Sequence, residues 1–199
     1  MNVKRLAALA MAVAALTAAC GSDDDEDATA AESNTTAAAA DHNDADVTFA
    51  QGMIPHHQQA VEMATLAEDR AESEDVKDLA ARIEAAQDPE IETMTVWLEE
   101  WDEPVAGGDE MEGMEMDDME MSEMGGMISE EDMTALEDAE GAAFDEQFLE
   151  MMAEHHRGAI EMAETEIEDG EFPDALELAQ EIVDTQTAEI AEIEELLAG

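Results

Sequence analysis

The chain contains an internal repeat whose two copies lie 99 positions apart. Phe49–Ala64 in the first copy corresponds to Phe148–Ala163 in the second, and each copy carries a His-His pair between two methionines. The correspondence continues at Leu79 and Leu178, Ile83 and Ile182, Gln87 and Gln186, Glu90 and Glu189, and Leu98 and Leu197. One helical hairpin cannot bury its apolar stripe alone, whereas two hairpins can cover each other. The repeat therefore predicts an all-α fold, a four-helix bundle built from two duplicated helical hairpins.

The composition also favours packed helices. Aromatic residues make up only 3% of the 199 residues and tyrosine is absent, although 45% of the residues are hydrophobic. Strands prefer aromatic and β-branched residues, so a β-sandwich is disfavoured. Helical spacing of apolar residues predicts main helices over 46–70, 74–101, 141–169 and 173–197, and a short capped helix after Ser129. Pro55 and Pro89 fall inside two of these ranges, and we expect a helix start or a kink there.

The first 19 residues read as a targeting segment. Lys4 and Arg5 precede an apolar run, and small residues follow directly before Cys20, the only cysteine. This order is typical of a secretory signal with a cleavage site, and the apolar run is too short to favour a permanent membrane span. The position of Cys20 resembles a bacterial lipobox, which implies lipidation there, with simple secretion as the alternative. We therefore expect an exported protein, lipid-anchored to the outer face of the cell membrane or in the periplasm.

The remaining chain divides by composition. Residues 20–45 form an acidic, flexible tether, in which we expect His42 to be solvated. The bundle domain follows over 46–199, with one hairpin at 46–101, a Met-rich acidic linker at 102–128 and the second hairpin at 129–199.

The net charge limits the partners. Six Lys and Arg stand against 56 Asp and Glu, which gives a formal charge of −50. Binding of nucleic acid requires a basic face, and attraction to anionic lipid has the same requirement, so both are excluded. Cationic partners such as metal ions remain open, and a halophilic source would produce the same acidity.

The paired histidines share one helix face with methionines. At about 100° per residue, the histidines and methionines of each copy fall within an arc of about 120°. Candidate metal ligands are Met53, His56, His57, Met63, Met152, His155, His156 and Met162. Glu62 and Glu161 fall opposite this face, and the chain has no Glu-x-x-His motif of the di-iron type. Thioether and imidazole together suit copper, particularly Cu(I). The alternative is a structural layer, because methionine stripes usually pack cores, or a pH-sensitive interface.

A second methionine feature lies in the linker. Residues 111–127 are acidic and punctuated by glycine, so a packing role for these methionines is not expected. A second soft-metal site, for Cu(I) or Ag(I), would comprise Met111, Met114, Met116, Met119, Met121, Met124 and Met127. The alternative is a disordered linker of biased composition.

Two segments carry a family resemblance. Met53-Ile54-Pro55-His56-His57 and the stretch 150–163 with its own His-His pair resemble the signature segments of the bacterial "domain of unknown function 305" family, over about residues 46–199. The resemblance implies a ferritin-like helical bundle, exported and often lipid-anchored, with copper binding in some members. Residue by residue, it implies the same eight His and Met ligands.

The functional hypothesis is a copper-binding lipoprotein of the cell envelope that sequesters or chaperones Cu(I) without catalysis. A ferritin-like metalloenzyme that oxidises Cu(I) or Fe(II) is one alternative. A structural or partner-binding lipoprotein without metal is another, and the sequence also allows a homo-oligomer. The sequence contains no Gly-x-Ser-x-Gly elbow and no cysteine besides Cys20, so hydrolysis by a nucleophile is not supported.

Overall fold

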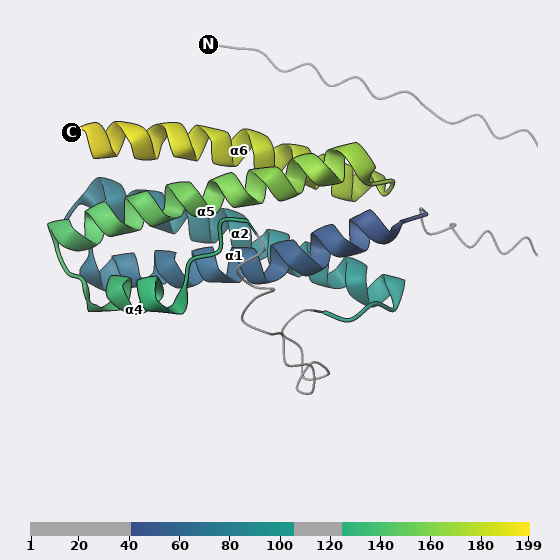
Figure 1. Ribbon diagram of the computed structural model, residues 1–199, viewed down its shortest axis with the longest axis horizontal. Helices are drawn as coiled ribbons and strands as arrows, with labels where there is room; N and C mark the ends of the chain where they lie inside the picture. Colours follow the sequence, from purple (N-terminus) through teal and green to yellow (C-terminus); the bar gives the residue numbers. More distant parts are fainter. Residues whose placement is uncertain (1–40, 106–124) are drawn as a thin grey trace, which may run out of the picture. The chain divides into compact units, whose positions relative to one another are not determined.

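The computed structural model of the protein describes residues 41–105 and 125–199, which form five helices and no strand. The helices are α1 (Asp44–Arg70), α2 (Glu74–Trp101), α4 (Glu130–Asp138), α5 (Ala142–Asp169) and α6 (Pro173–Ala198). The long helices α1 and α2 form one hairpin, α5 and α6 form the other, and the hairpins pack mainly through α1 and α5 (Figure 1). The all-α helical bundle predicted from the repeat is confirmed.

Local signals explain where the helices begin. Asn43 and Asp46 form a capping box at the start of α1, in which Asn43 Oδ1 accepts from the Ala45 N–H at 2.7 Å. The helix consequently begins at Asp44 and continues through Pro55, so a start near Ile54 is wrong. Likewise α2 continues through Pro89. The hydroxyl of Ser129 caps α4, as its position before an acidic turn predicts.

Two aspartates tie the hairpins together at opposite ends. Asp46 of α1 accepts from the Phe172 N–H, just before α6, at 2.9 Å. Asp145 of α5, its equivalent in the repeat, accepts from the Ser73 N–H, just before α2, also at 2.9 Å. We call α1 and α5, through which the hairpins pack, the inner helices, and α2 and α6 the outer helices. Each inner helix therefore binds the start of the outer helix of the other hairpin. The 99-residue repeat extends to the contacts that fix how the hairpins fit together.

The apolar core consists of two clusters. Phe144, Phe148, Leu79 and Ile83 belong to the first, and Ile54, Met94, Leu98 and Ile182 belong to the second. Because α1 and α5 run antiparallel, the C-terminal part of α1 meets the N-terminal part of α5 in the first cluster (Figure 1). The histidine pairs fall between the segments that build the two clusters, so they form a polar layer across the core.

The expected tether does not extend to residue 45. His42 stacks on Trp101 at the end of α2, with ring centroids 4.4 Å apart and ring planes 10° from parallel. His42 is therefore half-buried and not free in solvent as expected, because the Trp101 ring covers one face of the imidazole. The predictions for the signal segment, for Cys20 and for Met111 to Met124 lie outside the described residues.

None of the helices formed by the described residues combines the length and hydropathy that a membrane crossing demands.

Candidate metal centre

The four paired histidines lie at the crossing of α1 and α5. His56, His57, His155 and His156 all have a relative exposure of 0%. The rings of His56 and His155 pack against each other, with centroids 3.7 Å apart and planes inclined by 36°. Adjacent residues on a helix point about 100° apart, so only one histidine of each pair can face the opposite inner helix. The other two face the outer helices.

Each outward-facing histidine meets a glutamate of its own hairpin. His57 lies 2.6 Å from Glu90 of α2, measured from Nε2 to Oε2, and His156 lies 2.8 Å from Glu189 of α6. An ionised carboxylate can only accept, so in each pair the imidazole Nε2–H donates. This fixes the tautomer and leaves Nδ1 with its lone pair, the state in which imidazole binds a metal.

Several ring nitrogens of this layer are buried without a hydrogen-bond partner among the described residues. These are both nitrogens of His56 and of His155, and Nδ1 of His57 and of His156. A buried polar atom without a partner costs about 1–3 kcal/mol. Four such histidines are expensive if they serve packing alone, and a metal ion would satisfy their lone pairs.

The two histidines that face each other, His56 and His155, have lowered pKa values and are neutral at neutral pH. Burial, together with the proximity of His57 and His156, lowers the pKa of His56 from 6.5 to about 3. The Gly125 carbonyl, which faces His56 without reaching hydrogen-bond geometry, offsets part of this shift. Burial and the other three histidines also place the pKa of His155 well below its ordinary value. Neutral imidazole is the form that coordinates metals, so no proton need be displaced at neutral pH.

The four predicted methionines flank the layer on both sides. Met63 and Met152 belong to the first apolar cluster, whereas Met53 and the partly buried Met162 pack in the second. Each side therefore carries one thioether from α1 and one from α5. The structure places all eight predicted residues in or beside the layer, but the methionines divide between its two sides.

No three His, Cys, Asp or Glu side chains within residues 41–105 and 125–199 are grouped as metal ligands. The imidazole rings are instead arranged in pairs: the ring of His56 packs on that of His155, and each remaining histidine is hydrogen-bonded to its glutamate. A metal ion in this layer would draw on thioether sulfurs beside imidazole.

Sequence reasoning did not assign a role to Glu90 and Glu189. Both occupy equivalent positions in the repeat, 33 residues after the histidine that each one contacts. The same separation of 33 residues between histidine and glutamate in both copies was the sequence signal that could have identified them. The helical angle predicted that Glu62 and Glu161 lie opposite the histidine face. Both are exposed in the structure.

The end of the Met-rich linker docks beside the layer. The Gln59 side chain donates to the Ile128 carbonyl at 2.9 Å and accepts from the Ile128 N–H at 2.8 Å. Gly158, the repeat equivalent of Gln59, leaves room for this segment, since a Cβ there would lie 1.8 Å from the Gly125 carbonyl oxygen. Met127, the one described residue of the predicted loop site, is partly buried within this docked segment.

Comparison with known proteins identifies the family. The family model "Domain of unknown function (DUF305)" matches residues 46–197. The chain belongs to the DUF305 family. The resemblance stated from the two His-His segments is thus confirmed, and a search of curated proteins gives no match.

Solved structures share the bundle, and two of them are named as DUF305 proteins. A protein from Streptomyces coelicolor, whose name describes it as secreted, is 35% identical with a TM-score of 0.67, covering 77% of this chain and 92% of its own. A fragment from Deinococcus radiodurans is 30% identical with a TM-score of 0.68, covering 78% and 97%. CopM in a Cu(II)-bound form is 32% identical with a TM-score of 0.64, covering 77% and 95%. CopM is also known in Cu(I)-bound, Ag-bound and apo forms.

Proposed function

We propose that this protein is an exported copper-binding protein that sequesters or chaperones Cu(I) in the cell envelope. Copper is the cargo, held by the histidine layer and its flanking methionines. CopM, a similar structure solved with Cu(II), Cu(I) and Ag, supports a copper-binding role for this bundle.

The observation that carries this proposal is the duplicated His–Glu pair. A histidine that serves only packing needs a partner for each ring nitrogen. Here His57 and His156 each form a hydrogen bond to a glutamate through Nε2, and their Nδ1 atoms are buried without a partner among the described residues. A carboxylate behind an imidazole is the arrangement that orients metal-binding histidines and raises their basicity.

The flanking thioethers favour a soft ion. Met53, Met63 and Met152 are fully buried, and sulfur ligands beside imidazole suit Cu(I) better than a hard cation. The linker methionines, Met111 to Met127, would capture the ion first and pass it to the layer. The docking of Ile128 on Gln59 supports this sequence of events, because it holds the end of the linker near His56.

We propose a non-enzymatic role. An oxidase of Cu(I) or Fe(II) would be the alternative, and Fe(II) would favour carboxylate ligands. Glu90 and Glu189 are engaged by His57 and His156, which supports an orienting role for these carboxylates. Oxygen consumption during aerobic Cu(I) or Fe(II) addition would reveal turnover.

We also propose that Cys20 is the lipidated first residue of the exported protein. The support is the order of charged, apolar and small residues before that cysteine. Mass spectrometry of the membrane fraction, with Cys20→Ser as control, would detect the lipid. Release of an unlipidated wild-type chain would favour simple secretion.

The testing experiment is anaerobic Cu(I) titration of the full chain against a chromophoric chelator, alongside a variant without 106–124. We expect at least one tight equivalent in both proteins. If binding disappears with the segment, the linker is the functional element and the histidines are packing. If neither protein competes with the chelator, copper is not the cargo.

A further inference from the structure

A short segment before α4 crosses the contact between the inner helices. We call residues 125–128 the strap. On α1, both the N–H and the carbonyl of Ile128 are hydrogen-bonded to the side-chain amide of Gln59, at 2.8 and 2.9 Å. On α5, the strap packs so closely that a Cβ added at Gly126 would lie 2.8 Å from the Gly158 Cα. The strap therefore contacts both inner helices at once.

The strap lies over the pair of facing histidines. Gln59 follows His56 by three residues on α1. Gly158 follows His155 by three residues on α5. Residues three apart are neighbours on one helix face. Since α1 and α5 run antiparallel, Gln59 and Gly158 lie on opposite sides of the pair, and a segment that contacts both passes across it. The Gly125 carbonyl accordingly faces the His56 ring.

The repeat is broken at the two positions that hold the strap. Gln59 and Gly158 are equivalent in the repeat, but one carries a side chain that binds the strap and the other carries none. A Cβ at position 158 would lie 1.8 Å from the Gly125 carbonyl oxygen. The chain has one linker between its two copies, so it can form only one strap. The two equivalent positions thus differ in the way that a single strap requires.

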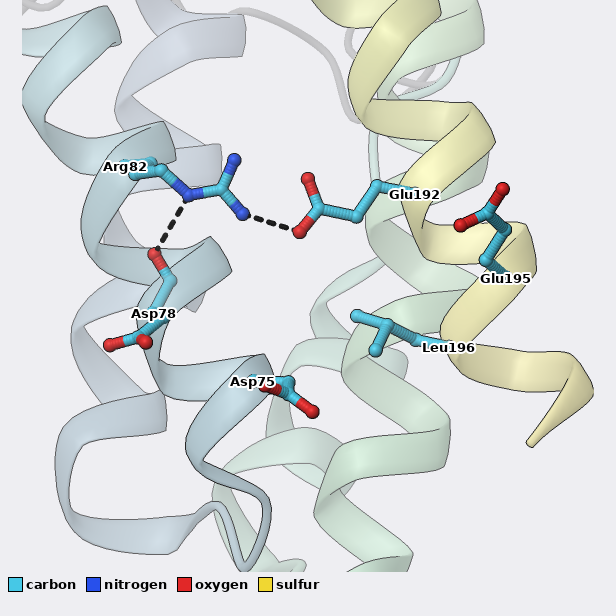
Figure 2. A pocket seen from close by; sticks show the side chains of 6 residues that line it. All are labelled: Asp75, Asp78, Arg82, Glu192, Glu195 and Leu196. Atoms are coloured by element: carbon cyan, nitrogen blue, oxygen red, sulfur yellow. Dashed lines mark hydrogen bonds and ion pairs between the residues drawn. The ribbon is translucent and has the colours of Figure 1, made fainter.

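On the side of the outer helices, the histidine nitrogens are engaged. Each histidine that faces an outer helix points Nε2 at a glutamate and is hydrogen-bonded to it. Between the outer helices themselves, Arg82 Nη2 of α2 donates to Glu192 Oε1 of α6 at 2.5 Å (Figure 2). The ring nitrogens that point toward α2 and α6 are therefore occupied.

The pair beneath the strap has its nitrogens free. Both nitrogens of His56 and of His155 are buried without a partner among the described residues. Each residue is 0% exposed, so an ion can reach these nitrogens only after part of the chain has moved aside. The long helices contribute the apolar core, whereas the strap is held by the side chain of Gln59 and by partial burial of Ile128. The strap is the cover that can open while the long helices stay in place.

We propose that the strap is a gate over the His56–His155 pair, which opens when Gln59 releases Ile128 and then admits Cu(I) to the ring nitrogens. This inference rests on the proposed copper function and names how the ion reaches the same layer. Gln59 is a positioning residue, because it holds the gate and is not a ligand.

The first test needs no metal. Diethyl pyrocarbonate acylates neutral imidazole that it can reach, and mass spectrometry of the chelator-treated full chain would follow each histidine at neutral pH. Gln59→Ala removes both hydrogen bonds of the strap, so we expect His56 and His155 to react about tenfold faster. An unchanged rate would overturn the gate. An equal rise at His57 and His156 would also overturn it, because the whole bundle would then have loosened.

The chain offers a matched control on the same helix. Gln51 Nε2 donates to the Pro104 carbonyl at 2.9 Å, at the other end of the linker. Gln51→Ala should leave the reaction of His56 and His155 unchanged, and an effect equal to that of Gln59→Ala would overturn the gate. Gly158→Ala displaces the strap from the α5 side, so it should expose the same two histidines without altering Gln59.

Copper loading tests the second half of the proposal. In anaerobic stopped flow with a chromophoric Cu(I) complex, Gln59→Ala should load about tenfold faster than the unaltered chain and Gln51→Ala should not. The stoichiometry at equilibrium should be unchanged. Cu(I) binding with loading and acylation that do not depend on Gln59 would overturn the gate alone. If the unaltered chain binds no Cu(I) at equilibrium, the proposed function is refuted, and the gate for copper falls with it.

Discussion

The ring of His56 lies 3.7 Å from the ring of His155, centroid to centroid, where α1 crosses α5. Both rings are fully buried and neither ring nitrogen of either has a partner among the described residues. Two neutral imidazoles tolerate this contact, whereas a proton on either would place a buried charge beside the other histidines. The contact makes the metal-free bundle sensitive to acid.

We expect the metal-free protein to lose stability as the pH falls below about 6.5. The pKa of His56 is lowered to about 3 in the folded chain, so the unfolded chain binds more protons between these values. The stabilisation present above pH 6.5 is therefore lost progressively toward pH 3. Urea unfolding of the chelator-treated chain at pH 7 and pH 4.5 would measure it. Replacement of His56 and His155 by Leu should flatten this dependence, and an unchanged slope would contradict the role of the pair.

The His–Glu pairs should set copper affinity. Glu90→Gln or Glu189→Gln retains the shape of the side chain but lets the amide donate to Nε2, which disturbs the tautomer that presents Nδ1. Loss of such an orienting partner costs about 10–100-fold in metal affinity. Competition titration with Cu(I) would measure this loss. The exposed Glu62→Gln, which removes the same charge on α1, should change affinity less than twofold, and equal effects would argue for surface charge alone.

The repeat made the bundle predictable, because burial of two equivalent apolar stripes requires two hairpins to pack together. Helical angle also placed His56 and His57 on the same face as Met53. The angle could not show which partner each histidine meets, His155 for His56 and Glu90 for His57, because that depends on which helices surround α1. Partners drawn from another helix are a tertiary property.

The start of the bundle was misplaced for a similar reason. The run of acidic and small residues before position 46 has the composition of a tether. The end of this run nevertheless belongs to the bundle. Asn43 forms a capping box with Asp46 that begins α1, and Trp101 stacks on His42. The capping box is a local signal visible in the sequence, whereas the stacking partner lies at the far end of α2.

Gly158 should be required for docking of the linker end. A Cβ at position 158 would lie 1.8 Å from the Gly125 carbonyl oxygen, so Gly158→Ala must displace residues 125–126 or α5. We expect a loss of about 1–3 kcal/mol in the free energy of unfolding, as for other overpacked sites. Gly125→Ala is the control, because its Cβ would meet the end of the Glu161 side chain at 3.3 Å and the Gly158 Cα only at 4.0 Å, an ordinary contact distance. Denaturant unfolding would compare them, and equal losses would show that the close approach at position 158 is not responsible.

Glu166 should destabilise the bundle as the pH rises. It is 1% exposed and neither carboxylate oxygen has a partner by hydrogen-bond geometry among the described residues. Burial, with the adjacent Asp46 carboxylate, raises its pKa from 4.5 to about 8. The folded chain therefore holds a proton that the unfolded chain releases, and stability falls between about pH 4.5 and pH 8.

The repeat supplies the control for this effect, because Ala67 occupies the position equivalent to Glu166. Beside Ala67, Asp145 accepts its hydrogen bond from the Ser73 N–H without a second carboxyl group. Glu166→Ala should consequently keep the hydrogen bond from the Phe172 N–H to Asp46. It should also raise the free energy of unfolding at pH 8 more than at pH 5. Urea unfolding at both pH values, with the exposed Glu164→Ala as a matched substitution on α5, would measure the difference. A gain of equal size at pH 5 and pH 8 would mean that Glu166 ionises normally in the folded chain.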